Sequence, residues 1–272
     1  MRKPAEAEAE MSFLDHLEVL RWHLVRSTIA ILSIGIVLFI FQKQVYDYFL
    51  LAHLKSNFPS YAWLCKLSGI FGIQSGFCNI KYGLVLQSLS PTDQLSNAIW
   101  SSAILGFIVA FPYVLYEIWR FISPGLTAKE RTNSKGFIFV SSFLFFLGVT
   151  FSYFIVSPLS VYFFFNYQIT DMIHNNFNFS SYVSMITNTL LGVSVVFELP
   201  IIIYFLTKIG LVTPQFLRKS RKYAIVVVLI LAAIITPPDV ASQIIVAIPI
   251  MMLYEASILI SKMVIKKQNE NV

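Results

Sequence analysis

The sequence predicts an all-α integral membrane protein with six transmembrane helices in one polytopic domain. Hydrophobic residues make up 57% of the 272-residue chain and charged residues only 12%, against about 25% in soluble domains. Mean hydropathy is +0.71. Uncharged runs recur that are long enough to cross a hydrocarbon core about 30 Å thick. Helices are expected because every backbone group must be satisfied internally in lipid.

Six apolar runs account for the predicted spans. In chain order they are about 24–42, 94–116, 136–157, 181–207, 223–236 and 240–261. The fifth is short. Prolines inside the second, fourth and sixth (Pro112, Pro200 and Pro249) each remove a backbone hydrogen bond and are expected to kink their helices. The sequence therefore predicts a bent, glove-like bundle.

The distribution of basic residues predicts the orientation. All but four of the twenty Lys and Arg fall in the N-terminal arm and the start of the first span, in 118–135, in 208–222 or in the C-terminal tail. These segments are assigned to the cytoplasm, together with both termini. The loop 158–180 has no Lys or Arg and is assigned to the outside. This topology explains the net charge of +6 without a nucleic-acid partner.

The N-terminal region is expected to combine a flexible arm, residues 1–11, with an amphipathic helix from Met11 to Arg26. Ser12 is its expected N-cap, with Asp15 three residues on. The helix is expected to lie along the inner membrane surface and continue into the first span. No cleavable signal peptide is predicted. Residues 263–272 are expected to form a cytoplasmic tail.

The segment 43–92 is expected to form a helical cap on the outer side. It contains the only two cysteines, Cys65 and Cys78. In an oxidising compartment a disulfide between them would stabilise the loop by about 3 kcal/mol. Two free thiols are the alternative.

The loop Tyr116–Lys135 is the densest candidate for recognition. Phe121 and Pro124 belong to a turn next to the membrane, and Glu130 lies between two basic residues. A carboxylate held in a shaped loop can bind a planar guanidinium through two hydrogen bonds. The alternative is a solvated loop in which Glu130 starts the next helix. Glu18, on the polar face of the arm helix, is either a second receptor carboxylate or an ordinary surface charge.

Glu198 is the most informative polar residue, because it lies in the apolar stretch 190–206. A carboxylate at this depth costs roughly 2.5–3.5 kcal/mol and is retained where it faces protein or a wet cavity. It either binds Ser, Thr or Tyr204 hydroxyls within the fold or is offered to a partner helix or substrate. Asp239 is interpreted mainly as a helix N-cap. Gln243, one turn into the last span, is expected to seek a partner across a helix interface.

The sequence contains none of the patterns typical of an enzyme, such as a nucleotide loop, a metal-ligand spacing or a nucleophile–base pair. His16 and His23 share a helix face, but no third ligand lies near them in sequence. No catalytic residue, cofactor or metal is therefore expected.

Several sequence blocks together resemble the TatC family, a subunit of the twin-arginine translocase. They are FLDHLEVLRWHL, FPYVLYEIWRFISPGLTAKER, FELPI, LRKSRKY and TPPDV followed by SQ and AIP, in this order over about residues 12–262. The resemblance implies a bacterial inner-membrane receptor for folded proteins bearing twin-arginine signal peptides, driven by the proton-motive force. Expected partners are these signal peptides, TatA/TatB-type single-span proteins, further TatC copies and lipid.

The resemblance also implies where the signal peptide binds. In the family, one carboxylate on the N-terminal arm and one in the first cytoplasmic loop receive the paired arginines. Glu130 matches the loop carboxylate, whereas the arm position is Val19 here, next to Glu18. We assign signal-peptide binding to five residues: Glu18, Arg21, Phe121, Pro124 and Glu130. The leading alternative function is a secondary transporter that couples protons through Glu198.

Overall fold

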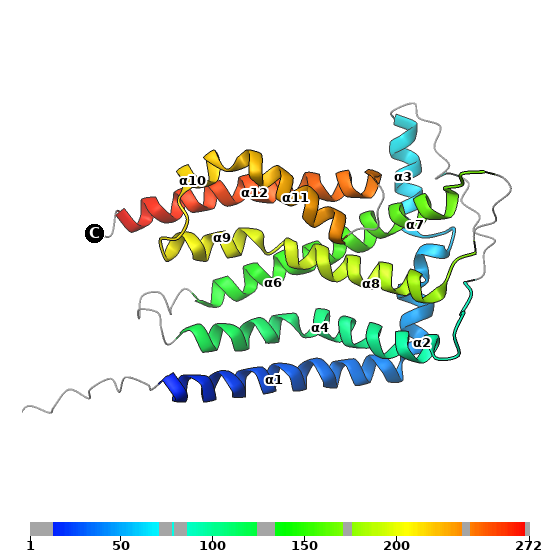
Figure 1. Cartoon of the computed structure of the whole chain (residues 1–272), viewed down its shortest axis with the longest axis horizontal. Helices are drawn as coiled ribbons and strands as arrows, with labels where there is room; N and C mark the ends of the chain where they lie inside the picture. The colour runs from blue at the N-terminus through cyan, green and yellow to red at the C-terminus, as the bar shows by residue number, and fades with distance from the viewer. Residues whose placement is uncertain are drawn as a thin grey trace, which may run out of the picture.

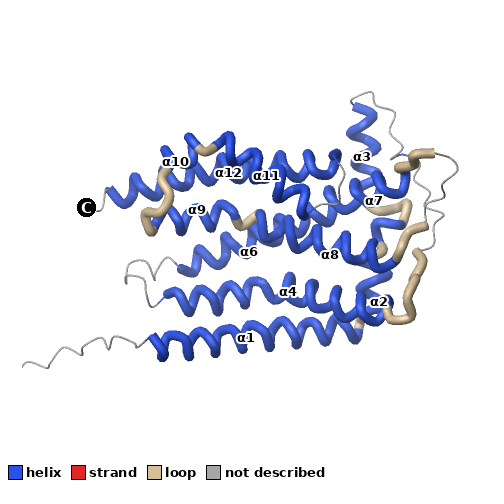
Figure 2. Tube along the Cα trace, in the orientation of Figure 1, coloured by secondary structure: helices blue, strands red, loops and turns tan. Residues whose placement is uncertain are grey.

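The computed structural model describes residues 13–70, 78, 86–123, 134–170, 176–235 and 240–269. Figure 2 shows that this part of the chain is helical apart from short connections, and no strand occurs in it. A single isolated bridge pairs Gln87 with Asn178. The prediction of an all-α protein is confirmed.

The long helices lie side by side, in the order α1, α4, α6 with α8, and then α9 with α11 and α12 (Figure 1). Their bounds are α1 Phe13–Ile40, α4 Asp93–Ile122, α6 Ser134–Phe151, α8 Phe179–Val196, α9 Leu199–Lys208, α11 Arg221–Ile235 and α12 Val240–Asn269. The start of α1 and the end of α12 lie at the same end of the bundle, which we call the terminal end.

Short helices cover the opposite end, which we call the cap end (Figure 1). They are α2 Gln42–Val45, the π-turn η1 Tyr46–Leu50, the 3₁₀ turn η2 Ala52–Leu54 and α3 Pro59–Ile70. A second π-turn, η5 Ser152–Val156, joins α6 to α7 Ser157–Asn166. The remaining short helix, α10 Pro214–Lys219, is not part of the cap and packs on α11 and α12. The predicted helical cap is thus present in the described part of 43–92, whereas 158–166, predicted as loop, is helix.

Five helical stretches of the described chain are long and apolar enough to cross a membrane. They are 17–40, 93–122, 136–166, 179–208 and 243–267. The fifth predicted span corresponds to α11, which has only 15 residues. A count of six spans is therefore not confirmed by helix length. Residues 263–269 of the expected tail are helical, because α12 continues to Asn269.

The amphipathic helix is predicted to lie along the membrane surface, but in the structure it runs in line with the first span. α1 is one uninterrupted helix of 28 residues in which the arm and the first span are continuous. The reason is local, because no proline and no glycine before Gly35 interrupts it. The expected Ser12–Asp15 cap lies outside the residues whose side chains the structure describes.

The three prolines have different effects. Pro200 follows a break at residues 197–198, which separates α8 from α9. Proline has no N–H for the carbonyl of Val196, four residues earlier, so the helix cannot continue there unchanged. By contrast, α4 continues through Pro112 and α12 through Pro249.

α1 and α4 approach each other closely at two glycines, Gly35 and Gly106. A Cβ atom on Gly106 would lie 2.9 Å from the carbonyl oxygen of Ile31 and 3.0 Å from the Cα of Gly35. A Cβ atom at position 106 would clash with the backbone of α1, so this close approach, typical of helices packed in lipid, requires glycine there. α1 packs mainly on α4, and many of its other side chains are exposed. α1 is therefore an edge helix whose position depends on one neighbour.

Candidate functional site

The two predicted site residues of the N-terminal region, Glu18 and Arg21, lie on the exposed side of α1 at the terminal end. From here on, the arm means this first part of α1. Glu18 and Arg21 are both exposed, whereas Val19 is half-buried. Adjacent residues of an α-helix differ in direction by about 100°. Glu18 therefore does not occupy the direction of Val19, the arm position at which the TatC pattern has a carboxylate.

The end of α4 lies against the same part of α1. The ring of Phe121, in the last turn of α4, meets the ring of His23 edge-on, with centroids 6.2 Å apart. The chain then enters the loop predicted to bind a signal peptide. Pro124 and Glu130 lie outside the described residues, so their predicted role stays a prediction.

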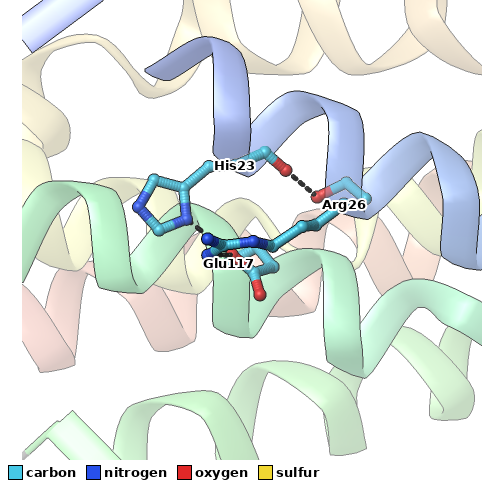
Figure 3. A network of polar contacts seen from close by, with 4 residues as sticks. His23, Arg26 and Glu117 are labelled. Atoms are coloured by element: carbon cyan, nitrogen blue, oxygen red, sulfur yellow. Dashed lines mark hydrogen bonds and ion pairs between the residues drawn. The ribbon is translucent and has the colours of Figure 1, made fainter. Parts of the chain in front are cut away.

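A buried polar network joins the two helices directly behind these residues (Figure 3). Nδ1 of His23 lies 2.5 Å from Oε2 of Glu117, and Nη1 of Arg26 lies 3.8 Å from the same oxygen. Tyr113, four residues before Glu117 on α4, lies close to the same carboxylate. Glu117 is 2% exposed and His23 9%. The imidazole and the guanidinium thus converge on one carboxylate that is shielded from the surroundings.

The sequence alone does not predict this network. Glu117 is recognisable as a carboxylate at the edge of an apolar run, and His23 attracts attention only as a metal ligand. The two residues are 94 positions apart in the chain. The available signal is the cost of burying Glu117, which requires a donor or cation from a neighbouring helix.

Glu198 is buried at the break between α8 and α9 and is 8% exposed. Ser141 on α6 donates a hydrogen bond to its Oε2 over 2.5 Å. Its other oxygen, Oε1, is buried and has no hydrogen-bond partner among the described residues. The structure thus selects the internal alternative, a serine hydroxyl, for one oxygen. The other alternative, in which Glu198 is offered to a partner helix or substrate, stays a prediction.

Of the remaining polar residues in or near the spans, Gln243 and Glu255 have partners in the structure. Gln243 on α12 donates from Nε2 to the carbonyl oxygen of Leu229 on α11 over 3.0 Å. It has therefore found a partner across a helix interface, as expected. Asp239 lies outside the described residues. Glu255 on α12 forms an exposed ion pair with Arg221 at the start of α11, over 2.6 Å.

The cap is attached to the bundle through a buried histidine. Nε2 of His53 lies 2.9 Å from the carbonyl oxygen of Tyr153, and the Tyr61 hydroxyl donates to the carbonyl of His53 over 2.6 Å. Burial lowers the pKa of His53 from 6.5 to about 4. A disulfide joins Cys65 and Cys78, whose Cα atoms are 5.0 Å apart. Within the described residues no group of three His, Cys, Asp or Glu could hold a metal ion.

Comparisons with known proteins agree with the sequence blocks. The family model described as "Sec-independent protein translocase protein (TatC)" matches residues 15–249. The chain belongs to the TatC family. It is 41% identical to the TatC of Blattabacterium sp. subsp. Periplaneta americana over 260 residues, which cover 95% of this chain and 98% of that relative. It is 34% identical to the TatC of Aquifex aeolicus over 261 residues, covering 96% and 98%.

The fold of this TatC-family chain is also similar to a solved one. A crystal structure described as "Twin Arginine Translocase Receptor- TatC" matches with a TM-score of 0.70 and 35% sequence identity, covering 92% of this chain and 99% of that one. The family match starts within α1 and ends within α12. It therefore includes Glu18 and Arg21 on α1, the loop after α4 and the break at Glu198, and it favours the translocase over a proton-coupled transporter.

Proposed function

We propose that this protein is the core signal-peptide receptor of the twin-arginine translocation system, exporting folded proteins across a membrane. The observation that carries the proposal is the TatC match over residues 15–249. The relatives are named Sec-independent protein translocase proteins, and the solved neighbour is named a twin-arginine translocase receptor. The proposal transfers this role to the present chain.

The proposed recognition is electrostatic. The paired arginines of a signal peptide bind carboxylates at the terminal end, with Glu130 as the main acceptor. Glu18 and Arg21 on the arm, with Phe121 and Pro124 around the start of the loop, complete the proposed surface. A guanidinium–carboxylate pair offers two parallel hydrogen bonds, which lysine cannot reproduce. This difference in donor geometry explains how an arginine pair would be preferred to a lysine pair.

The proposed setting is the bacterial cytoplasmic membrane, with both termini in the cytoplasm. This orientation follows from the basic residues of the N-terminal region, 118–135, 208–222 and the C-terminal tail. The start of α1 and the end of α12 lie at one end of the bundle, which is compatible with it (Figure 1). The proposed partners are TatA/TatB-type single-span proteins and other TatC copies. The proton-motive force supplies the energy, and the chain itself is not an enzyme.

Binding of two signal peptides to the purified protein tests the proposal. A twin-arginine peptide is expected to bind, and the same peptide with two lysines is expected to bind about tenfold more weakly, because a charge-assisted hydrogen bond contributes about 1.5–3 kcal/mol. Glu130→Lys should remove most of the preference while leaving the melting temperature unchanged. Equal affinity of the parent for both peptides would contradict the proposed function.

A further inference from the structure

We propose that the buried contact between His23 and Glu117 positions the arm relative to the first cytoplasmic loop, and thereby sets the affinity for signal peptides. This inference rests on the proposed function and deepens it. His23 and Glu117 are positioning residues here, because both are buried and neither is placed in contact with the peptide.

The contact lies between the two segments that would form the receptor surface. On α1, Glu18 and Arg21 are within two turns of His23. On α4, Glu117 lies in the last two turns before the helix ends at Ile122 and the chain enters the loop. The hydrogen bond between His23 and Glu117 therefore connects α1, next to the arm residues, with the end of α4 that leads into the loop (Figure 3).

α1 needs a directional contact at this level. The close backbone approach of α1 to α4 lies further toward the cap end, at Gly35 and Gly106. Toward the terminal end, α1 carries exposed apolar side chains, including Leu17 at 43%, Trp22 at 56% and Leu24 at 56%. Lipid solvates such side chains as well as protein does, so they do little to fix the rotation of a helix about its axis.

The chemistry of the network suits this task. Nδ1 of His23 donates to the Glu117 carboxylate when the ring proton is on Nδ1, and a carboxylate partner favours that arrangement. Arg26, 3.8 Å from the same carboxylate oxygen and on the same helix, adds a second attraction along α1. A rotation of α1 that moved His23 away would leave Glu117 buried without this donor. The network therefore favours one rotation of α1.

A charge exchange tests the inference. His23→Glu places a second carboxylate against Glu117 and should displace the arm, whereas the double variant His23→Glu/Glu117→His restores an imidazole–carboxylate pair with its members exchanged. Glu255→Gln is the matched control, because it breaks another ion pair between helices, Arg221–Glu255, without touching α1 or α4. Glu117→Gln is the mild variant, to be used if His23→Glu does not fold.

The first measurement is independent of any peptide. Spin labels on cysteines introduced at Trp22 and Ile122, both exposed, report the distance between α1 and α4 by electron paramagnetic resonance. Cys65 and Cys78 are joined in a disulfide and do not take the label. We expect a narrow distance distribution in the parent and in Glu255→Gln, a broadened or shifted one in His23→Glu, and recovery in the double variant.

The second measurement is the affinity for the twin-arginine peptide, with the melting temperature of each variant measured in parallel. His23→Glu should bind about tenfold more weakly, within the usual range of coupling between sites, and the double variant should recover. Unchanged distances and affinity in both His23→Glu and Glu117→Gln would overturn the inference, as would an equal loss in Glu255→Gln. If the parent does not prefer arginine to lysine, the proposed function fails, while the distances still decide whether the contact positions the arm.

Discussion

Ser141 on α6 and Glu198 at the break between α8 and α9 are joined by a buried hydrogen bond of 2.5 Å. The two residues are 57 positions apart in the chain, so the bond connects helices that are distant in sequence. It satisfies one oxygen of a carboxylate that the membrane would otherwise penalise. The other oxygen has no partner among the described residues, so this is where an additional donor could bind.

Replacement of Ser141 by alanine should destabilise the protein. It removes the donor to Glu198 Oε2 and leaves a buried carboxylate unsatisfied, at a cost of about 1–3 kcal/mol. Thermal unfolding of the purified protein measures the effect. Ser33→Ala is a suitable control, because the Ser33 hydroxyl bonds only to the Ala30 carbonyl on the exposed side of α1. Equal melting temperatures for Ser141→Ala and Ser33→Ala would show that the hydrogen bond contributes little.

Export assays on two Glu198 variants distinguish a hydrogen-bonding role from proton coupling. Glu198→Gln keeps the shape and an acceptor for Ser141, so it should retain more export than Glu198→Ala. A transporter that couples protons through Glu198 predicts a different result. Glutamine cannot exchange a proton, so Glu198→Gln should then be as inactive as Glu198→Ala. Crosslinking from position 198 should capture a partner helix or an inserted signal peptide. Equal loss in both variants, without a crosslink, would contradict the partner role.

The stability of the cap should fall as the pH falls from about 6.5 to about 4. Burial lowers the pKa of His53 to about 4 in the folded protein, against 6.5 for the free side chain. Within this window the unfolded chain binds a proton that the folded chain excludes. The stabilisation is complete above pH 6.5 and decreases by up to about 3 kcal/mol as the pH reaches 4.

Melting temperatures between pH 7.5 and pH 4 (~0.5-unit steps) measure this effect. The variant His53→Phe keeps a ring beside Phe58 and Tyr153, whose centroids both lie 4.6 Å from that of His53. It should be less stable at neutral pH, because the carbonyl of Tyr153 loses its donor, but it should lose less stability on acidification. Parallel pH curves for the two proteins would exclude His53 as the cause.

The cysteines of the cap should be oxidised in the mature protein. Alkylation followed by mass measurement should add nothing before reduction and two groups after it, because the chain has only two cysteines. Cys65→Ser should lower the stability of the cap, by about 3 kcal/mol for a loop of this size. Alkylation of both thiols before reduction would contradict the disulfide.

Much of the architecture follows from the sequence, and the reason is the solvent. An apolar run in lipid must be helical, so the predicted runs and the observed helices agree in order and position, and α11 is short in both. The errors are of another kind. The third helical stretch ends at position 166 and not at 157, and α1 is one continuous helix. Hydropathy predicts where the apolar run ends, but it does not predict how far the helix continues beyond that run.

The sequence by itself determined the class of protein, the family and the residues expected to bind arginine, because these depend on composition and on ordered local motifs. Only the tertiary structure decided which polar groups meet. His23 finds Glu117 and Ser141 finds Glu198 because particular helices are neighbours in particular rotations. A helix pattern specifies which face is apolar, but it does not specify the neighbour that a buried charge will contact.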